Sequence, residues 1–131
     1  MPGKLKVLVV DDVEMNRIIL SELFADSYNV LEAENGEEAL ETIRNNPDLS
    51  AVLLDIVMPV MDGYEFLAAI KEDPKFDSIP VIVTTQNDGE SEEVAALSCG
   101  AADFVAKPYK PQIILHRVAS IIHLRETAAL V

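Results

Sequence analysis

The chain has 131 residues, with 10 Lys or Arg against 23 Asp or Glu, so its formal net charge is −13. Its length suits one domain of roughly 100–200 residues, and the 50% of hydrophobic residues excludes a disordered chain. The acidic balance disfavours direct binding to nucleic acids or anionic membranes, because both require patches of Lys and Arg. A single cysteine and the lack of an apolar stretch of about 18 residues predict a cytoplasmic protein without a membrane span.

Short apolar runs alternate with amphipathic helical patterns along the whole chain. The aliphatic run at residues 7–10 predicts a strand, and a helix follows with Asp12 as its expected N-cap. The mixed segment at residues 28–34 predicts an edge strand. A second helix is expected to begin after Asn35 and Gly36 and to end near residues 45–46.

The second half of the chain repeats this alternation. Residues 51–54 and 81–83 are continuous aliphatic runs, which are typical of strands buried on both faces of a sheet. Between them, the apolar spacing after Asp62 and Gly63 predicts a helix. Residues 102–107 are more mixed and predict a second edge strand.

Two more helices complete the pattern. One is expected to end at Gly100, in the C′ position that favours glycine. The single cysteine, Cys99, lies in its last turn and is expected to be a buried, inert thiol. The last helix is expected to run from Pro111 to about Arg125 and to leave residues 126–131 as a frayed tail.

The predicted order is therefore five strands, each followed by a helix. Parallel strands joined by right-handed helical crossovers form a doubly wound α/β sheet. The aliphatic strands are the first, third and fourth, and the mixed ones belong at the edges. The strand order is thus predicted to be 2-1-3-4-5, as in a flavodoxin-like fold. No linker or repeat divides the chain, so residues 4–125 are predicted to form one domain.

Chemically active side chains follow or end four of the predicted strands. They are Asp11 and Asp12 for the first strand, Asp55 for the third, Thr84 and Thr85 for the fourth, and Lys107 for the fifth. Each acid alone has a simple structural explanation, since Asp is a favoured helix cap and a common loop residue. Together, three carboxylates repel one another, and a hard divalent cation such as Mg²⁺ would balance their charge. A carboxylate beside the cation could also accept a phosphoryl group, with Lys107 and Thr85 contacting its oxygens.

The sequence resembles the receiver domain of two-component response regulators over residues 4–124. Any one of the shared motifs is weak, since an Asp-Asp pair is common, but their order and spacing together are specific. The matching segments are residues 9–12 (VVDD), 35–40 (NGEEAL), 55–63 (DIVMPVMDG), 80–85 (PVIVTT) and 100–108 (GAADFVAKP).

The resemblance implies a role for each candidate site residue. Asp55 is expected to be the phosphoacceptor and, with Asp12, a direct ligand of Mg²⁺, for which Mn²⁺ could substitute. Asp11 is expected to reach the metal through water, and the backbone carbonyl of Val57 to complete the protein ligands. Lys107 is expected to pair with Asp55 and then with its phosphate.

The resemblance also implies a switch. Thr85, rather than Thr84, matches the position of the family's switch hydroxyl. Phe104 matches the switch aromatic, for which ordinary core packing is the alternative. The bond before Pro108 is expected to be cis, which X–Pro bonds tolerate.

Three residues are expected to flank the phosphate and to tune its lifetime: Val57, Gln86 and Asn87. Gln86 departs from the family pattern, which has a small residue after the switch threonine. Its long polar side chain is expected to crowd the phosphoryl site or to orient water.

The resemblance implies a signalling switch that catalyses only its own phosphorylation and dephosphorylation. The phosphoryl donor would be a histidine kinase or a histidine phosphotransfer protein. The surface of the fourth helix, fifth strand and fifth helix would change and could bind a second copy or an output domain. Two alternatives stay open: a degenerate receiver that only binds proteins, and a flavodoxin-like electron carrier. The acidic loop after the first strand disfavours the carrier, because it would repel a flavin phosphate.

Overall fold

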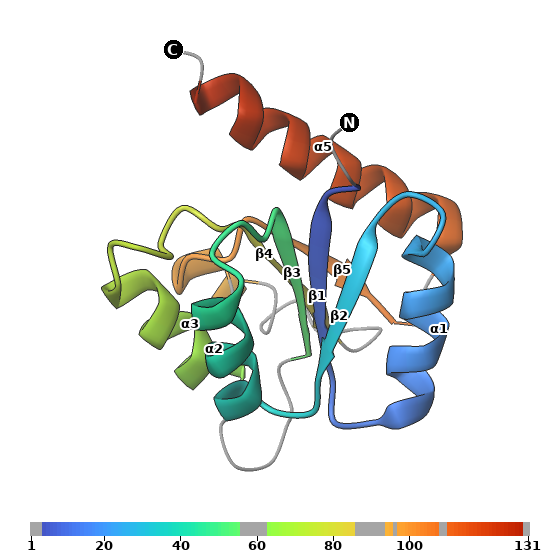
Figure 1. The fold of residues 1–131 in the computed structure, drawn as a ribbon, viewed down its shortest axis with the longest axis horizontal. Helices are drawn as coiled ribbons and strands as arrows, with labels where there is room; N and C mark the ends of the chain where they lie inside the picture. The colour runs from blue at the N-terminus through green and yellow to red at the C-terminus, as the bar shows by residue number, and fades with distance from the viewer. Residues whose placement is uncertain (1–3, 56–62, 86–93, 96, 108–109, 130–131) are drawn as a thin grey trace.

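The structure, a computed structural model, describes residues 4–55, 63–85, 94–95, 97–107 and 110–129. Its strands are β1 (Lys6–Val10), β2 (Asn29–Ala33), β3 (Ala51–Asp55), β4 (Val81–Thr85) and β5 (Asp103–Ala106), and its helices are α1 (Glu14–Phe24), α2 (Gly36–Asn45), α3 (Gly63–Glu72) and α5 (Pro111–Ala129) (Figure 1). Residues 94–95 and 97–98 are also helical, and the rest of the helix predicted before Gly100 lies outside the described residues. Within the described part, no helix is long and apolar enough to cross a membrane.

The five strands form one parallel sheet in the order β2-β1-β3-β4-β5, which confirms the predicted order. β1 and β3, in the centre, are almost entirely buried. β2 and β5, at the two edges, are mostly half-buried or exposed. The continuous aliphatic runs thus occupy the strands that are covered on both faces.

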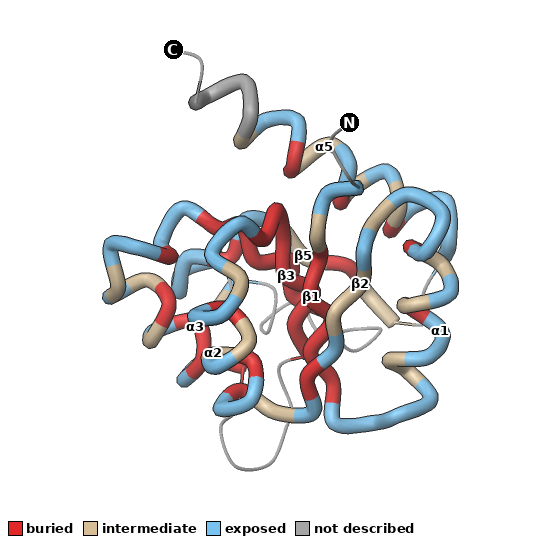
Figure 2. Tube along the Cα trace, viewed as in Figure 1, coloured by how far each residue is buried: buried red, intermediate tan, exposed pale blue. Residues whose placement is uncertain are grey.

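Helices cover both faces of the sheet. α1 and α5 lie on one face, and α2 and α3 lie on the other (Figure 1). Successive side chains of a strand point to opposite faces, so Val7 and Val9 pack with α1 and α5, whereas Leu8 and Val10 pack with α2 and α3. Figure 2 shows the buried central strands between helices whose outer surfaces are exposed. This arrangement leaves the ends of the strands as the places where polar side chains can gather.

α1 begins differently from the prediction. Asp12 does not cap the helix, because Val13 occupies the N-cap position and makes no side-chain cap hydrogen bond. The carboxylate that serves this turn belongs to Asp11, whose Oδ1 accepts a hydrogen bond from the backbone N–H of Val13 at 2.9 Å. The prediction was wrong because two adjacent Asp residues are equally good caps by residue type, and only the course of the backbone distinguishes them.

Gly100 has a φ of 105°, as predicted for a residue that ends a helix in the left-handed region. A Cβ at this position would lie 3.1 Å from side-chain carbons of Lys71, so space as well as backbone conformation favours glycine. The neighbouring Cys99 is exposed, and the expectation of a buried thiol was wrong. Residues 97–100 are all exposed, so this turn lies away from the core.

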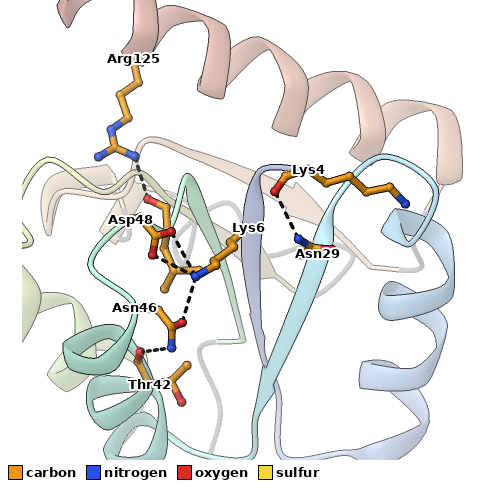
Figure 3. Close-up of polar contacts among 8 residues, drawn as sticks. Lys4, Lys6, Asn29, Thr42, Asn46, Asp48 and Arg125 are labelled. Atoms are coloured by element: carbon orange, nitrogen blue, oxygen red, sulfur yellow. Dashed lines mark hydrogen bonds and ion pairs between the residues drawn. The ribbon is translucent and has the colours of Figure 1, made fainter. Parts of the chain in front are cut away.

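The opposite end of the sheet, where the strands begin, carries a polar network (Figure 3). Lys6 and Asp48 form an ion pair, with Nζ 3.1 Å from Oδ2. Arg125 of α5 donates a hydrogen bond to the backbone carbonyl of Leu49 at 2.9 Å. α5 continues past Arg125 to Ala129, so its predicted end was too early. The Arg125 contact ties this part of the helix to the start of β3, which apolar spacing could not reveal.

The Lys6–Asp48 pair gives a pH-dependent prediction. The hydrogen bond from Lys6 lowers the pKa of Asp48 below its usual value of 3.8. The ionised form is therefore favoured in the folded protein, and its stabilisation is present above the usual pKa and lost as pH falls through the lowered one. Asp48→Asn should lower the melting temperature at about pH 6 and have a smaller effect at about pH 3.

Thermal unfolding of wild type and Asp48→Asn at the two pH values checks this expectation. Asp26→Asn, which removes another exposed acid, controls for the change in net charge. The prediction would be contradicted if Asp48→Asn lowered the melting temperature equally at both pH values. It would also be contradicted if the melting temperature of Asp26→Asn fell with the same pH dependence.

Candidate functional site

Three carboxylates meet at the carboxyl end of the sheet. β1 and β3 are neighbours, with Val10 opposite Leu54, so Asp11 and Asp55 follow at the same level. One carboxylate oxygen each of Asp11, Asp12 and Asp55 lies within 4.8 Å of the others. Asp11 and Asp55 are buried, with 1% and 7% of their surface exposed, whereas Asp12 is exposed. The structure therefore brings the three predicted acids together at one partly buried position.

Lys107 reaches this cluster from the edge of the sheet. It follows β5, and its Nζ lies 3.4 Å from Oδ1 of Asp55. The Lys107 side chain is 21% exposed and that of Asp55 is 8% exposed, so water screens this pair only partly. Because β4 lies between β3 and β5, the long side chain of Lys107 has to pass the end of β4 to make this contact.

β4 ends beside the cluster with two threonines. Thr84 is opposite Asp55 in the sheet and is buried, and its hydroxyl lies 3.5 Å from the backbone carbonyl of Leu54. The backbone of Thr85 pairs with Ala106, one residue before Lys107. The Thr85 side chain lies outside the described part, so its assignment as the switch hydroxyl stays a prediction.

Asp11 is held by two residues that the sequence patterns did not single out. Its Oδ2 accepts a hydrogen bond from Nδ2 of Asn16 at 3.1 Å, and its backbone carbonyl accepts one from Nη1 of Arg17 at 2.8 Å. Arg17 also pairs with Glu32 of β2, with 3.3 Å between Nε and Oε1. Apolar spacing carries no signal for these contacts. The only sequence feature that could have suggested Asn16 and Arg17 is their position in the first turns of the helix that follows Asp11 and Asp12.

Phe104 lies in β5 and is half-buried. It lines a hollow of about 210 Å³ together with residues of β5 and α5, among them Lys107, Lys110, Ile113 and Arg117. Among the residues that the structure describes, Phe104 is not part of either buried core cluster. Its role as a switch aromatic stays a prediction.

Four other candidates lie outside the described residues: Val57, Gln86, Asn87 and Pro108. The metal ligand expected from the Val57 carbonyl, the rate-tuning roles of Val57, Gln86 and Asn87, and the cis bond before Pro108 therefore stay predictions.

The donor set of the acid cluster fits a magnesium ion. Mg²⁺ prefers oxygen ligands and is held in proteins by carboxylates, waters and phosphate oxygens. Among the residues that the structure describes here, three carboxylates face one ammonium group, which leaves a surplus of two negative charges. A divalent cation would balance that surplus and relieve the repulsion between Asp11 and Asp55 in their buried positions.

Residues 7–119 match the family model of the response regulator receiver domain. The chain is similar to the chemotaxis protein CheY1 of Helicobacter pylori, with 36% identity over 120 residues that cover 90% of this chain and 97% of CheY1. It is also similar to the response regulator PleD of Caulobacter vibrioides, with 38% identity over 122 residues and 92% of this chain. The chain spans only 26% of the length of PleD.

The same likeness appears in three dimensions. The solved structure of the chemotaxis protein CheY4 of Vibrio cholerae has a TM-score of 0.84 with this chain at 28% identity, over 91% of this chain and 99% of that one. The family match covers most of the chain, and the fold and strand order agree with it. The chain therefore belongs to the family of response regulator receiver domains, which are signalling domains of two-component systems.

Proposed function

We propose that this chain is a phosphorylation-operated switch that accepts a phosphoryl group on Asp55. One observation carries the proposal: the buried Asp55 carboxylate lies within 4.8 Å of two other acids and 3.4 Å from the Lys107 ammonium group. A carboxylate in such a site can act as a nucleophile towards phosphorus. One oxygen of Asp55 attacks the phosphorus, a P–O bond forms, and the bond to the leaving group breaks. With a phosphohistidine donor, the leaving group is an imidazole, which then takes up a proton.

The acid cluster would hold the cation. Asp12 and Asp55 are the proposed direct ligands, with the Val57 carbonyl, and Asp11 is proposed to act through a bound water. Mg²⁺, or Mn²⁺ in its place, would supply positive charge next to the phosphoryl oxygens. The protein's own contribution is to keep three acids close together at a site from which water is partly excluded.

Lys107 and Thr85 are proposed to contact the phosphoryl oxygens and to transmit the presence of the phosphoryl group to the rest of the domain. Phosphorylation adds negative charge and acceptor oxygens, which attract an ammonium group and a hydroxyl donor. Lys107 already lies at the Asp55 carboxylate, so only a small movement is needed for it to contact the new oxygens. A shift of Thr85 towards the phosphate would make room for Phe104 to turn inward and so change the β5–α5 surface.

The partners follow from the family. A histidine kinase or a histidine phosphotransfer protein is the proposed donor, and the surface that includes β5 and α5 is the proposed contact for a second copy or an output domain. The chain is proposed to work in the cytoplasm without binding nucleic acid directly. It is also proposed to hydrolyse its own aspartyl phosphate at a rate tuned by Val57, Gln86 and Asn87.

Treatment of the purified protein with acetyl phosphate tests this function. We expect intact-mass spectra to show one added phosphoryl group when Mg²⁺ is present and almost none when a chelator removes it, because the acid cluster would otherwise repel the anionic donor. A protein that stays unmodified in Mg²⁺ would instead favour a degenerate receiver that only binds other proteins. A yellow protein with bound flavin would favour the electron carrier.

A further inference from the structure

The Asp11 carboxylate is fixed at both of its oxygens. Oδ1 accepts a hydrogen bond from the backbone N–H of Val13 at 2.9 Å, and Oδ2 accepts one from the Asn16 side chain at 3.1 Å. The residue is 99% buried, since only 1% of its surface is exposed. Rotation of this carboxylate would break at least one of the two hydrogen bonds in a place where water could not readily replace it.

The main chain at Asp11 is fixed as well. Its backbone carbonyl accepts a hydrogen bond from Nη1 of Arg17 at 2.8 Å, and the same guanidinium group pairs with Glu32 of β2. The Arg17 side chain is 11% exposed, so it joins α1 to the ends of β1 and β2 largely out of solvent. Because its backbone and one carboxylate oxygen are held independently of Asn16, Asp11 should stay in place without Asn16 but lose the second hydrogen bond that limits rotation of the carboxylate.

The orientation of a carboxylate matters for the choice of cation. Ca²⁺ takes six to eight oxygen ligands in flexible geometry and often binds a carboxylate through both oxygens. Mg²⁺ requires a near-octahedral arrangement, keeps several waters, and uses few carboxylates. Asp12 is exposed and therefore less constrained by its surroundings than Asp11, whose two carboxylate oxygens both accept hydrogen bonds.

We propose that Asn16 is a positioning residue that fixes Asp11 and thereby makes the acid cluster select Mg²⁺ over Ca²⁺. The inference rests on the proposed function, in which the cluster holds a divalent cation. The Asn16 amide keeps the Asp11 carboxylate from turning to offer both oxygens to a larger ion. The lone pairs that remain free on Asp11 keep one direction, which suits a hydrogen bond from a metal-bound water.

Replacement of Asn16 should loosen this selection without unfolding the protein. The core contacts of α1 are made by Leu20, Leu23 and Phe24, and Asn16 is only half-buried. Isothermal titration with Mg²⁺ and with Ca²⁺ measures the two dissociation constants directly. We expect Asn16→Ala to weaken Mg²⁺ binding about tenfold, as is typical when a group that orients a ligand is lost. We expect Ca²⁺ binding to change by less, so that the preference for Mg²⁺ falls.

Two further variants complete the test. Asn16→Gln keeps an amide donor and should restore much of the Mg²⁺ preference. Asn29→Ala removes a side-chain amide that donates to the backbone carbonyl of Lys4 at the other end of the sheet, and both dissociation constants should stay at their wild-type values (Figure 3). Melting temperatures in chelator show whether each variant is folded, and they are not expected to follow the change in preference.

Two results would overturn the inference: wild-type Mg²⁺ affinity in Asn16→Ala, or an equal loss of affinity for both ions. Asp12→Asn separates this failure from that of the proposed function. If Asp12→Asn leaves Mg²⁺ binding unchanged, the acid cluster is not the cation site and the proposed function itself fails. If Asp12→Asn abolishes binding while Asn16→Ala keeps the wild-type preference, only the role of Asn16 is wrong.

Discussion

Asp55→Asn is expected to abolish phosphorylation of this chain by acetyl phosphate and by any histidine-containing donor. The substitution keeps the shape of the side chain but removes the negative charge and the nucleophilic oxygen. Asp55 is buried and is the acid of the cluster whose carboxylate lies 3.4 Å from the Lys107 ammonium group, so we expect neither Asp11 nor Asp12 to replace it as acceptor. The carboxamide also lessens the repulsion among the acids, and we therefore expect the variant to fold at least as well as the wild type.

Intact-mass spectra of wild type and Asp55→Asn, after the same treatment in Mg²⁺, measure the effect. Asp48→Asn is a matched control, because it makes the same chemical change at the opposite end of the sheet (Figure 3). The control should gain the phosphoryl group to the wild-type extent. An equal adduct on Asp55→Asn would show that another residue accepts the phosphoryl group.

The sheet could be predicted because a strand that is buried on both faces has a continuous run of aliphatic residues. β1 and β3 must be apolar on both faces, so their aliphatic runs identified them as central. β2 and β5 have more exposed positions, and their mixed sequences are typical of edge strands. The carboxyl ends of parallel strands meet at one edge of the sheet, and this rule, together with the predicted adjacency of β1 and β3, is enough to predict that Asp11 and Asp55 lie close together.

The contacts around the cluster could not be predicted in the same way. Asn16 and Arg17 reach Asp11 through particular side-chain conformations. The hydrophobic periodicity of helices and strands does not predict such conformations. Asp12 was wrongly predicted to cap α1, and Cys99 was wrongly predicted to be buried, for a related reason. Residue type favours a cap or a buried thiol, but the path of the chain decides which atom meets a partner and which meets solvent.

Lys107→Met is expected to lower the free energy of unfolding in chelator by about 3 kcal/mol, because it leaves the Asp55 carboxylate buried beside two acids without its ammonium partner. Methionine keeps a flexible, unbranched chain, so the loss should come from charge rather than from packing. Removal of the positive charge also removes its repulsion of a bound cation. We therefore expect Mg²⁺ to bind Lys107→Met at least about tenfold more tightly than it binds the wild type.

Binding to the folded state alone adds RT ln(1 + [L]/Kd) to stability, so saturating Mg²⁺ should restore much of what Lys107→Met loses. Urea unfolding of the wild type and of Lys107→Met, each with Mg²⁺ and with chelator, gives the four free energies of unfolding that this comparison needs. Lys110→Met is the control, because Lys110 is exposed and lies three residues along the chain, and it should show the wild-type response to Mg²⁺. A smaller gain from Mg²⁺ in Lys107→Met than in the wild type would mean that the ammonium group helps to hold the cation site together. The 3.4 Å pair with Asp55 would then organise the acids instead of competing with the metal for their charge.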